Sequence, residues 1–348
     1  MIVPFAFLEK FILVEIALVV FIIILAYALK YYFYRKANHD KRISNQIQES
    51  IVSAVVSQSY PSEATFPKSW KRLDIILPLF FKLDSTIDSP HWPEMKTTMA
   101  RTILLPVARK KFDSRRWMNR LYSAQCFELA MEDQDEAIIS FLLEDKIPLV
   151  HLHAAIAAIR FSSASLINLV INVMAKKRRL SQTVYLKVFD LAAPHSQQFI
   201  IDRLDTENDP FIRATCYKIL LNFKDKLPAI DTTNDINSNN MELRLAAIRY
   251  TAFADKRHAV PLLVSLLSDT RWEVRAASNR LLGELNATQA IDEISHCLKD
   301  QVWWVRVNAA NTLKSFGEIG IKVLNEQDPS VDLYAYETAM HVLNKPLT

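Results

Sequence analysis

DTRWEVRAASNRLLGELNATQAIDEISHCLKDQVWWVRVNAA, the stretch from Asp269 to Ala310, contains one pattern twice. An aspartate and a Val-Arg pair recur at a spacing of 31 residues: Asp269, Val274 and Arg275 return as Asp300, Val305 and Arg306. A unit this small cannot bury its own apolar face and must pack on a copy of itself. A fixed period of this length therefore indicates a stacked repeat array.

The spacing continues towards the N-terminus. Seven register positions lie 31 residues apart, and five of them are arginine: Arg120, His151, Gln182, Arg213, Arg244, Arg275 and Arg306. The columns twelve and eight residues before this position are mostly apolar, and four residues between them means one helical face. The column three residues after it is mostly small, as close helix packing requires: Ser123, Ala154, Tyr185, Cys216, Ala247, Ser278 and Ala309. Pro148 and Pro210 fit the first turn of a second helix, so each repeat is predicted to be a helical hairpin.

These columns predict an all-α fold. We expect an α-solenoid of about seven 31-residue hairpins with terminal caps, preceded by one transmembrane helix. Half of the 348 residues are hydrophobic, which supports a large core, and 3 glycines leave little material for tight hairpins or phosphate loops. Cys126, Cys216 and Cys297 are odd in number and lie in separate repeats. They indicate small core residues in a reducing compartment rather than a disulfide framework.

The N-terminus reads as a retained membrane anchor. Residues 11–29 are apolar except for Glu15, and at ~1.5 Å per residue they span roughly 28 Å, near the thickness of a hydrocarbon core. A cleaved signal peptide is less consistent, because the start lacks a basic region and YALKYY is not a small-residue cleavage site. Contact with the bilayer is expected through residues 11–34, which end in an aromatic belt.

Charge near the anchor predicts its orientation. Residues 30–42 carry five Lys or Arg, against Glu9, Lys10 and Glu15 on the other side. The positive-inside rule then places the N-terminus outside and the C-terminal solenoid in the cytoplasm. The chain is therefore expected to be a single-pass membrane protein. Residues 1–42 hold a net +3 of the chain's +4, so the remaining chain is nearly neutral and nucleic acid is not an expected partner.

We divide the chain at these features. Residues 1–42 are the anchor with its basic juxtamembrane segment, residues 43–92 an amphipathic helix, a linker and the start of an N-terminal cap, and residues 93–348 the repeat solenoid. Ile43, Ile47, Ile51 and Val55 form the apolar stripe of the amphipathic helix, which Pro61 and Pro67 are expected to end. Residues 331–343 echo the repeat at a shorter offset and are expected to cap its other end.

The units LLVSLLSDTRWEVRAASNRLL and IDEISHCLKDQVWWVRVNAANTL resemble HEAT repeats, specifically the short variety also found in phycobilisome lyases, with its D-x-x-x-x-VR-x-x-A signature. Gln182, Asp205 and Ser238 depart from that signature. In this family the aspartate between helices and the arginine of the second helix bond neighbouring repeats as a ladder. The resemblance implies this structural role for six residues: Asp269, Asp300, Arg213, Arg244, Arg275 and Arg306.

We expect no catalytic site, no metal and no cofactor. HEAT-like iron hydroxylases use His-Glu dipeptides as ligands, and the sequence contains no His-Glu. His151 and His153 are two residues apart on a predicted helix, so they point to different faces and make a poor metal pair. There is also no G-x-x-x-x-G-K-[ST], G-x-S-x-G or H-E-x-x-H. A lyase activity would rest on the family name alone.

Two surfaces are candidates for partner binding. Five residues after the register position stand four cations in consecutive repeats: Lys187, Lys218, Arg249 and Arg280. The second helix of a HEAT repeat lines the concave side, so by resemblance these cations form a stripe suited to an acidic helix or a phosphorylated ligand. The alternative is a solvated row that nearby carboxylates neutralise. Trp303 and Trp304 are adjacent, so both cannot face the core, and they are the second candidate.

A further basic patch, Arg109, Lys110, Lys111, Arg115 and Arg116, lies near the anchor in sequence and could touch anionic lipid; a charged loop is the alternative. The leading functional hypothesis is a membrane-tethered cytoplasmic scaffold or adaptor that binds a membrane-associated protein partner through the solenoid groove. Bacterial HEAT proteins of similar layout are associated with membrane glycosyltransferases, which suggests such an enzyme as the partner. The alternative is an accessory enzyme or lyase-like protein acting on a small anionic ligand, which a closed pocket would favour.

Overall fold

The computed structural model describes residues 5–57, 68–176, 179–223, 227–255 and 257–344. All regular structure in these ranges is helical. The chain divides into two compact units, Met1–Phe161 and Ser162–Thr348, and each is described by itself.

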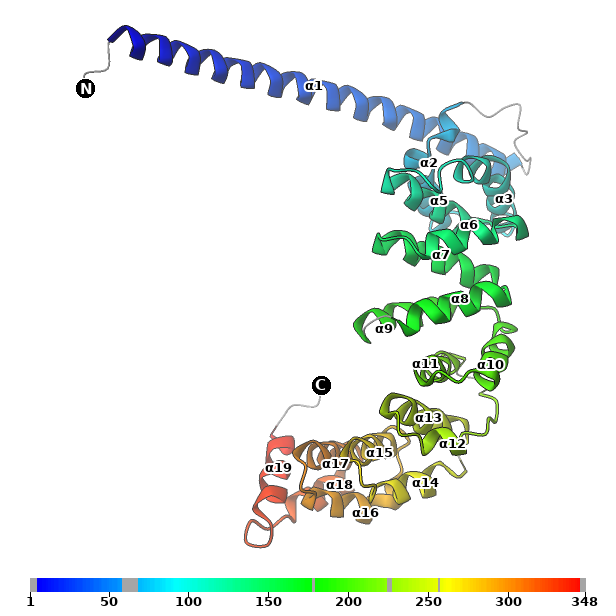
Figure 1. The fold of residues 1–348 in the computed structure, drawn as a ribbon, viewed down its shortest axis with the longest axis vertical. Helices are drawn as coiled ribbons and strands as arrows, with labels where there is room; N and C mark the ends of the chain where they lie inside the picture. The colour runs from blue at the N-terminus through cyan, green and yellow to red at the C-terminus, as the bar shows by residue number, and fades with distance from the viewer. Residues whose placement is uncertain (1–4, 58–67, 177–178, 224–226, 256, 345–348) are drawn as a thin grey trace. The chain divides into compact units, whose positions relative to one another are not determined.

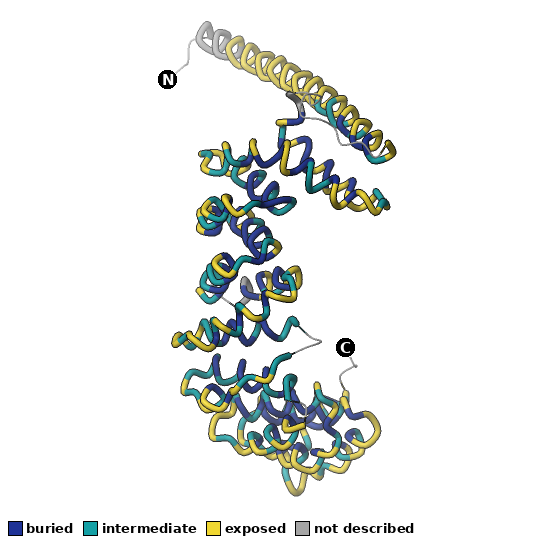
Figure 2. The backbone as a smooth tube through the Cα atoms, turned by 90° about the vertical axis from the view of Figure 1, so that its right-hand side faces the viewer, coloured by how far each residue is buried: buried dark blue, intermediate teal, exposed yellow. Residues whose placement is uncertain are grey.

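The first unit begins with one continuous helix, α1 (Phe5–Ser57). By length and composition alone, its part from Leu13 onwards could cross a membrane, and the most apolar window is exposed throughout. Figure 2 shows the same division: α1 is exposed along most of its length and becomes buried only near its C-terminal end. The apolar run and the amphipathic stripe therefore belong to a single helix.

The C-terminal part of α1 packs on α2 (Leu73–Asp84), which follows the 3-10 turn Lys68–Lys71 (Figure 1). Ile47 and Ile51 of the predicted stripe are buried to 1% and 0% exposure. At the edge of this contact, Arg72 donates hydrogen bonds to both carboxylate oxygens of Asp40, at 2.5 and 3.3 Å. The predicted break at Pro61 and Pro67 lies outside the described residues.

The rest of the first unit builds two hairpins. The helices are α3 (Trp92–Met99), a π-helical turn (Ala100–Leu104), α4 (Leu105–Ala108), α5 (Trp117–Leu129), α6 (Glu136–Leu143), with the 3-10 turn Asp133–Asp135 before it, and α7 (Pro148–Phe161). Pro78 lies inside α2 without dividing it, whereas Pro106 lies in the first turn of α4, where its missing N–H is harmless. The second helices, α5 and α7, pack side by side (Figure 1).

The second unit continues with five further hairpins and a closing one. They are α8 (Ala164–Ala175) with α9 (Arg179–Val188), which ends in the 3-10 turn Phe189–Leu191; α10 (Ser196–Thr206) with α11 (Pro210–Leu220); α12 (Thr233–Ile236) with α13 (Met241–Ala254); α14 (Ala259–Leu266) with α15 (Trp272–Glu284); α16 (Ile291–His296), flanked by the 3-10 turns Thr288–Ala290 and Cys297–Lys299, with α17 (Trp303–Ser315); and α18 (Glu318–Asn325) with α19 (Leu333–Leu343). Within the described residues, every one of the seven register positions falls in the second helix of a hairpin. The predicted all-α solenoid is confirmed.

The core consists of the columns that the sequence repeats. All seven members of the small column are buried to 2% exposure or less, because this face packs between successive hairpins. At the C-terminal end, α18 comes so close to α17 that a Cβ on Gly320 would lie 1.8 Å from the carbonyl oxygen of Leu313. The three cysteines are buried as core residues, and burial raises the pKa of the Cys216 thiol to about 12.

Candidate functional site: the ladder and the groove of the second unit

Where the register residue is arginine, it connects its own hairpin to the next. In α15, Arg275 donates from Nε and Nη2 to the two carboxylate oxygens of Asp300, at 2.7 and 2.8 Å. Its Nη1 donates to the carbonyl oxygen of Asp269, at 2.9 Å, in the loop before its own helix. Arg244 makes the equivalent pair of bonds to Asp269. One guanidinium thus fixes its own loop and the loop of the following repeat.

Asp300 of this ladder is charged at neutral pH. Burial by itself would raise the pKa of Asp300, but the hydrogen bonds from Arg275 and from the Val302 N–H outweigh burial and hold that pKa below its ordinary value. The Arg275 side chain is 16% exposed and that of Asp300 11% exposed. Bidentate pairing in this sheltered position is stronger than a surface ion pair, because water competes less for either group.

Two ladder partners were missed by the sequence reasoning. Arg120 pairs with Asp145, which lies 25 residues later as Asp300 lies after Arg275, so the spacing itself could have found it. The aspartate of the signature would fall at position 238, which is Ser238. Arg213 pairs instead with Asp235, about one helical turn before that position. The hydroxyl of Tyr217 also donates to Asp235, at 2.7 Å.

The last arginine of the ladder, Arg306, has different partners from the others. Arg306 lies 9% exposed in α17, and the capping hairpin offers it no aspartate at the ladder position. Its Nε donates to the hydroxyl of Thr338 at 3.3 Å, and its guanidinium lies 5.3 Å from the ring centroid of Tyr334. A cation–π contact therefore takes the place of one ion pair at the end of the array.

The basic column lies along a groove formed by the second helices α9, α11, α13 and α15. Lys218, Arg249 and Arg280 line a pocket of about 310 Å³ together with apolar residues that include Leu186 and Leu245. Lys187 belongs to the same column on α9 and is exposed, although it does not line the pocket. The structure thus places three of the four cations together in one groove that apolar side chains also line.

Carboxylates interrupt this column. Lys218 Nζ lies 2.5 Å from Glu242 Oε1, and Arg249 Nη2 lies 2.9 Å from Glu284 Oε2. Glu284 also approaches Arg280, whose Nε is 3.5 Å away and whose side chain is 59% exposed. The groove is therefore an alternating row of charges rather than a uniformly basic stripe. Whether these cations bind a partner stays a prediction.

The tryptophan pair is fully on the surface. Trp303 and Trp304 are the first residues of α17 and are 45% and 55% exposed, with ring centroids 4.6 Å apart at an interplanar angle of 70°. Other second helices also carry an exposed aromatic ring in the first turn, among them Trp117 at 41%, Phe211 at 50% and Trp272 at 39%. Sequence reasoning missed these three, although they lie in the first turn as Trp303 and Trp304 do.

In the part of the chain that the structure describes, no group of three or more His, Cys, Asp or Glu side chains could hold a metal. His153 Nδ1 lies 2.7 Å from Glu128 Oε2, so this histidine ties α7 to α5. His151 occupies one of the two register positions that are not arginine, and it is 9% exposed. The two imidazoles therefore have separate surroundings.

Comparison with known proteins identifies the repeats. The family model described as HEAT repeats matches residues 233–314 and 260–332. No curated protein matches the chain. Among solved structures, human deoxyhypusine hydroxylase in complex with glycerol is 13% identical, with a TM-score of 0.29 over 74% of this chain and 98% of that one. A mutant of Kap121p is 14% identical, with a TM-score of 0.46 over 85% of this chain and 37% of that one. An engineered protein is 16% identical, with a TM-score of 0.30 over 86% and 95%. With their hairpin array and this family match, residues 233–332 of the chain are HEAT repeats.

Proposed function

We propose that this protein is a membrane-tethered scaffold that holds a protein partner in the groove of its second unit. HEAT repeats are protein-interaction scaffolds, and one observation carries the assignment to this groove: a pocket of about 310 Å³ that both apolar side chains and alternating charges line. Interfaces between proteins commonly combine an apolar centre with a polar rim. An amphipathic helix with acidic positions beside its apolar stripe would fit this surface.

The scaffold acts by binding and not by catalysis. Burial raises the pKa of the Cys126 and Cys216 thiols far above neutral pH. A thiol kept protonated in this way reacts slowly, because the thiolate is the reactive form. The apolar and charged side chains of the groove are instead suited to recognition.

The tether is the apolar part of α1. With its N-terminus outside and its repeats in the cytoplasm, the anchor would confine the groove to the membrane surface and raise its effective concentration towards a membrane-embedded partner. By family resemblance, the partner we favour is a membrane glycosyltransferase of envelope polysaccharide synthesis. The five cations between residues 30 and 42 support the orientation.

The groove is tested best with its two closest ion pairs, Lys218–Glu242 and Arg249–Glu284, left in place. Reversing Lys218 or Arg249 would leave Glu242 or Glu284 facing a like charge and would destabilise the fold. Lys187 and Arg280 are exposed and contribute less to those pairs, so Lys187→Glu with Arg280→Glu changes the field of the groove and spares the Lys218–Glu242 contact.

The measurement is affinity capture from solubilised membranes, followed by mass spectrometry. The matched control reverses two exposed cations elsewhere in the same unit, Lys299→Glu with Lys322→Glu. Partners of the wild type should be lost from the groove variant, retained by the control, and released by added salt, because exposed charges are screened within about 8 to 10 Å. Retention of the same partners at the same yield by the groove variant would move the binding surface elsewhere.

A further inference from the structure

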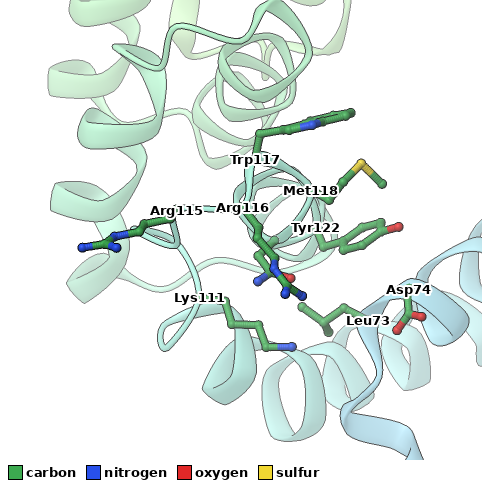
Figure 3. Close-up of a pocket in the computed structure, with 9 residues that line it drawn as sticks. Leu73, Asp74, Lys111, Arg115, Arg116, Trp117, Met118 and Tyr122 are labelled. Atoms are coloured by element: carbon green, nitrogen blue, oxygen red, sulfur yellow. The ribbon is translucent and has the colours of Figure 1, made fainter.

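A second pocket lies in the first unit, between the start of α2 and the start of α5. Its volume is about 520 Å³. Figure 3 shows the side chains of Lys111 and Arg116 extending towards one space, which Leu73 and Asp74 bound on the other side, whereas Arg115 extends away from it. Tyr122 lies on the wall from α5. Cations and aromatic rings thus meet in one concave site.

The surroundings of this pocket are strongly basic. Among the described residues, Lys111, Arg115 and Arg116 have no recorded ion pair, and Lys71 and Lys110 line an adjoining pocket of about 480 Å³ together with Lys111. Arg109, the remaining member of the sequence patch, does not contribute, because Asp135 and Glu132 hold its guanidinium.

Two carboxylates reduce this positive charge only in part. Asp74 is paired with Arg72, at 2.6 Å between Nη2 and Oδ2, and Asp113 is exposed in the loop before Arg115. Burial raises the pKa of Tyr122, and the charge of Asp74 adds to the effect, so its hydroxyl stays neutral and can donate a hydrogen bond. The two pockets and their rim thus carry five cations, and Asp113 is the one carboxylate beside them in this part of the described chain that forms no ion pair, which suits an anionic ligand.

The loop that carries these cations is held in place before any ligand arrives. Arg120, fixed by Asp145, donates from Nη1 to the carbonyl oxygens of Ser114 at 2.8 Å and of Arg115 at 3.4 Å. Asn119 Nδ2 bonds the Ser114 hydroxyl at 3.0 Å. Helix α5 also begins at Trp117 without a side-chain cap, so its positive dipole end opens on this side. The backbone of this loop therefore loses little conformational entropy on binding.

The position of the pocket points to the origin of the ligand. Arg72 precedes Leu73 of the pocket wall and is bonded to Asp40 of α1. Asp40 lies six residues beyond Tyr34, the last ring of the aromatic belt, which is about 9 Å along a helix. If the apolar part of α1 crosses a membrane, as in the proposed function on which this step rests, the pocket stands beside the headgroups of the adjoining leaflet.

We propose that this pocket binds the phosphate headgroup of an anionic phospholipid. Lys111 and Arg116 contact the phosphate, and Tyr122 donates to it. Trp117 and Met118 are 41% and 37% exposed on the rim, where an aromatic ring and a thioether can lie at the boundary between headgroups and acyl chains. Lys71, Lys110 and Arg115 supply the wider field that attracts the anionic surface. The site would fix which face of the first hairpins lies against the membrane.

The test uses the full chain in a neutral detergent and follows hydrogen exchange of residues 109–122. Four additions are compared at equal concentration: dioctanoyl phosphatidylglycerol, dioctanoyl phosphatidylcholine, inorganic phosphate and polyglutamate. The variant is Lys111→Gln with Arg116→Gln. Its matched control, Lys299→Gln with Lys322→Gln, removes two exposed cations from the other unit. Neither of the two pocket cations has a recorded partner among the described residues, so the variant should fold, and exchange in α2 and α6 checks that it does.

Phosphatidylglycerol should slow exchange at residues 109–122, and phosphatidylcholine should not. The variant should bind phosphatidylglycerol about 30-fold more weakly, roughly fivefold for each cation removed near an anionic headgroup, with the control unchanged. Equal protection by phosphatidylcholine, or equal binding by variant and wild type, would overturn the proposal. Protection by phosphate or polyglutamate as strong as that by the lipid would assign the pocket to a free anion or to an acidic protein and would overturn it as well.

Alkaline extraction of membranes separates this inference from the proposed function. A chain that resists extraction but does not respond to phosphatidylglycerol retains its anchor and lacks the lipid site. A chain that is extracted but still binds the lipid in detergent keeps the lipid site, and the anchoring is then what fails.

Discussion

Replacing Arg275 by alanine should destabilise the second unit by about 2 to 3 kcal/mol. The change removes two bonds to Asp300 and one to the Asp269 carbonyl oxygen. What remains for Asp300 is the Val302 N–H at 2.8 Å, and its side chain is only 11% exposed. A sheltered carboxylate that loses its cation carries the desolvation cost of that charge, about 1 to 3 kcal/mol, and the upper half of this range applies because the pairing was bidentate.

The measurement is thermal unfolding of the full chain in detergent, with hydrogen exchange of α15 and α17 as the local readout. For a unit of this size each kcal/mol corresponds to about 2 to 4 °C, so the transition should fall by about 4 to 12 °C. The loss should spread to both neighbouring hairpins, because each repeat depends on its interfaces. Exchange in the separate first unit should not change.

Arg271→Ala is the matched control. Arg271 lies four residues before Arg275, its side chain is 54% exposed, and its one ion pair, to Glu273, is long at 3.4 Å. Its removal should therefore lower the free energy of unfolding by less than about 0.5 kcal/mol. A double variant with Asp300→Ala should cost less than the two single changes together, because both remove the same bonds. If Arg275→Ala unfolds at the temperature of Arg271→Ala, the register arginines are surface charges and the ladder carries no stability.

Acid, glycine substitution and a reporter fusion should each change the protein in a defined way. The pKa values of Asp300 and Asp145 are lowered from 3.8, since their bonds to Arg275 and Arg120 outweigh burial. The stability that these two carboxylates contribute is therefore complete above pH 3.8 and is lost as the pH falls through the lowered pKa. Melting temperatures should drop below about pH 4, and the melting temperature of Asp300→Asn should drop less than that of the wild type over the same range. Gly320→Ala should lower the free energy of unfolding by about 1 to 3 kcal/mol in chemical denaturation, because the new Cβ would lie 1.8 Å from the Leu313 backbone, and this outweighs the better helix propensity of alanine. In Gly283→Ala the new Cβ meets only the Thr312 side chain, so this control should lose less stability. Equal losses in the two variants would contradict this account. A reporter fused after Thr348 should be active only if it works in the cytoplasm, and activity of a periplasmic reporter there would overturn the proposed orientation.

The hairpins could be predicted because the residues that form their core recur at a fixed spacing. A column that occurs in seven successive repeats can be recognised even where one member differs from the others. The ladder followed from the same register at Asp269 and Asp300, whereas Asp145 keeps the same spacing after Arg120 and was overlooked. The ladder was missed at Asp235 because the short helix α12 supplies the carboxylate one turn early, and a column analysis looks only at Ser238.

The chemistry of the groove could not be predicted in the same way. Glu242 lies two residues before one register position and Glu284 nine residues after another, so the two carboxylates share no column. They meet the basic column only because α13 and α15 pack beside the helices that carry the cations. The pocket at Lys111 and Arg116 depends similarly on the approach of α2, which lies outside the repeat.

Helix α1 runs without a break from its apolar part to the residues that pack on α2. An uninterrupted helix transmits rotation as well as distance, since each residue turns the chain by about 100°. If a bilayer holds the apolar part, the azimuth of the first hairpins about the membrane normal is set by the number of residues between Tyr34 and Asp40. Two residues inserted there would swing the first hairpins by about 200°, whereas four would return them to within about 40° of their original heading and lift them by about 6 Å.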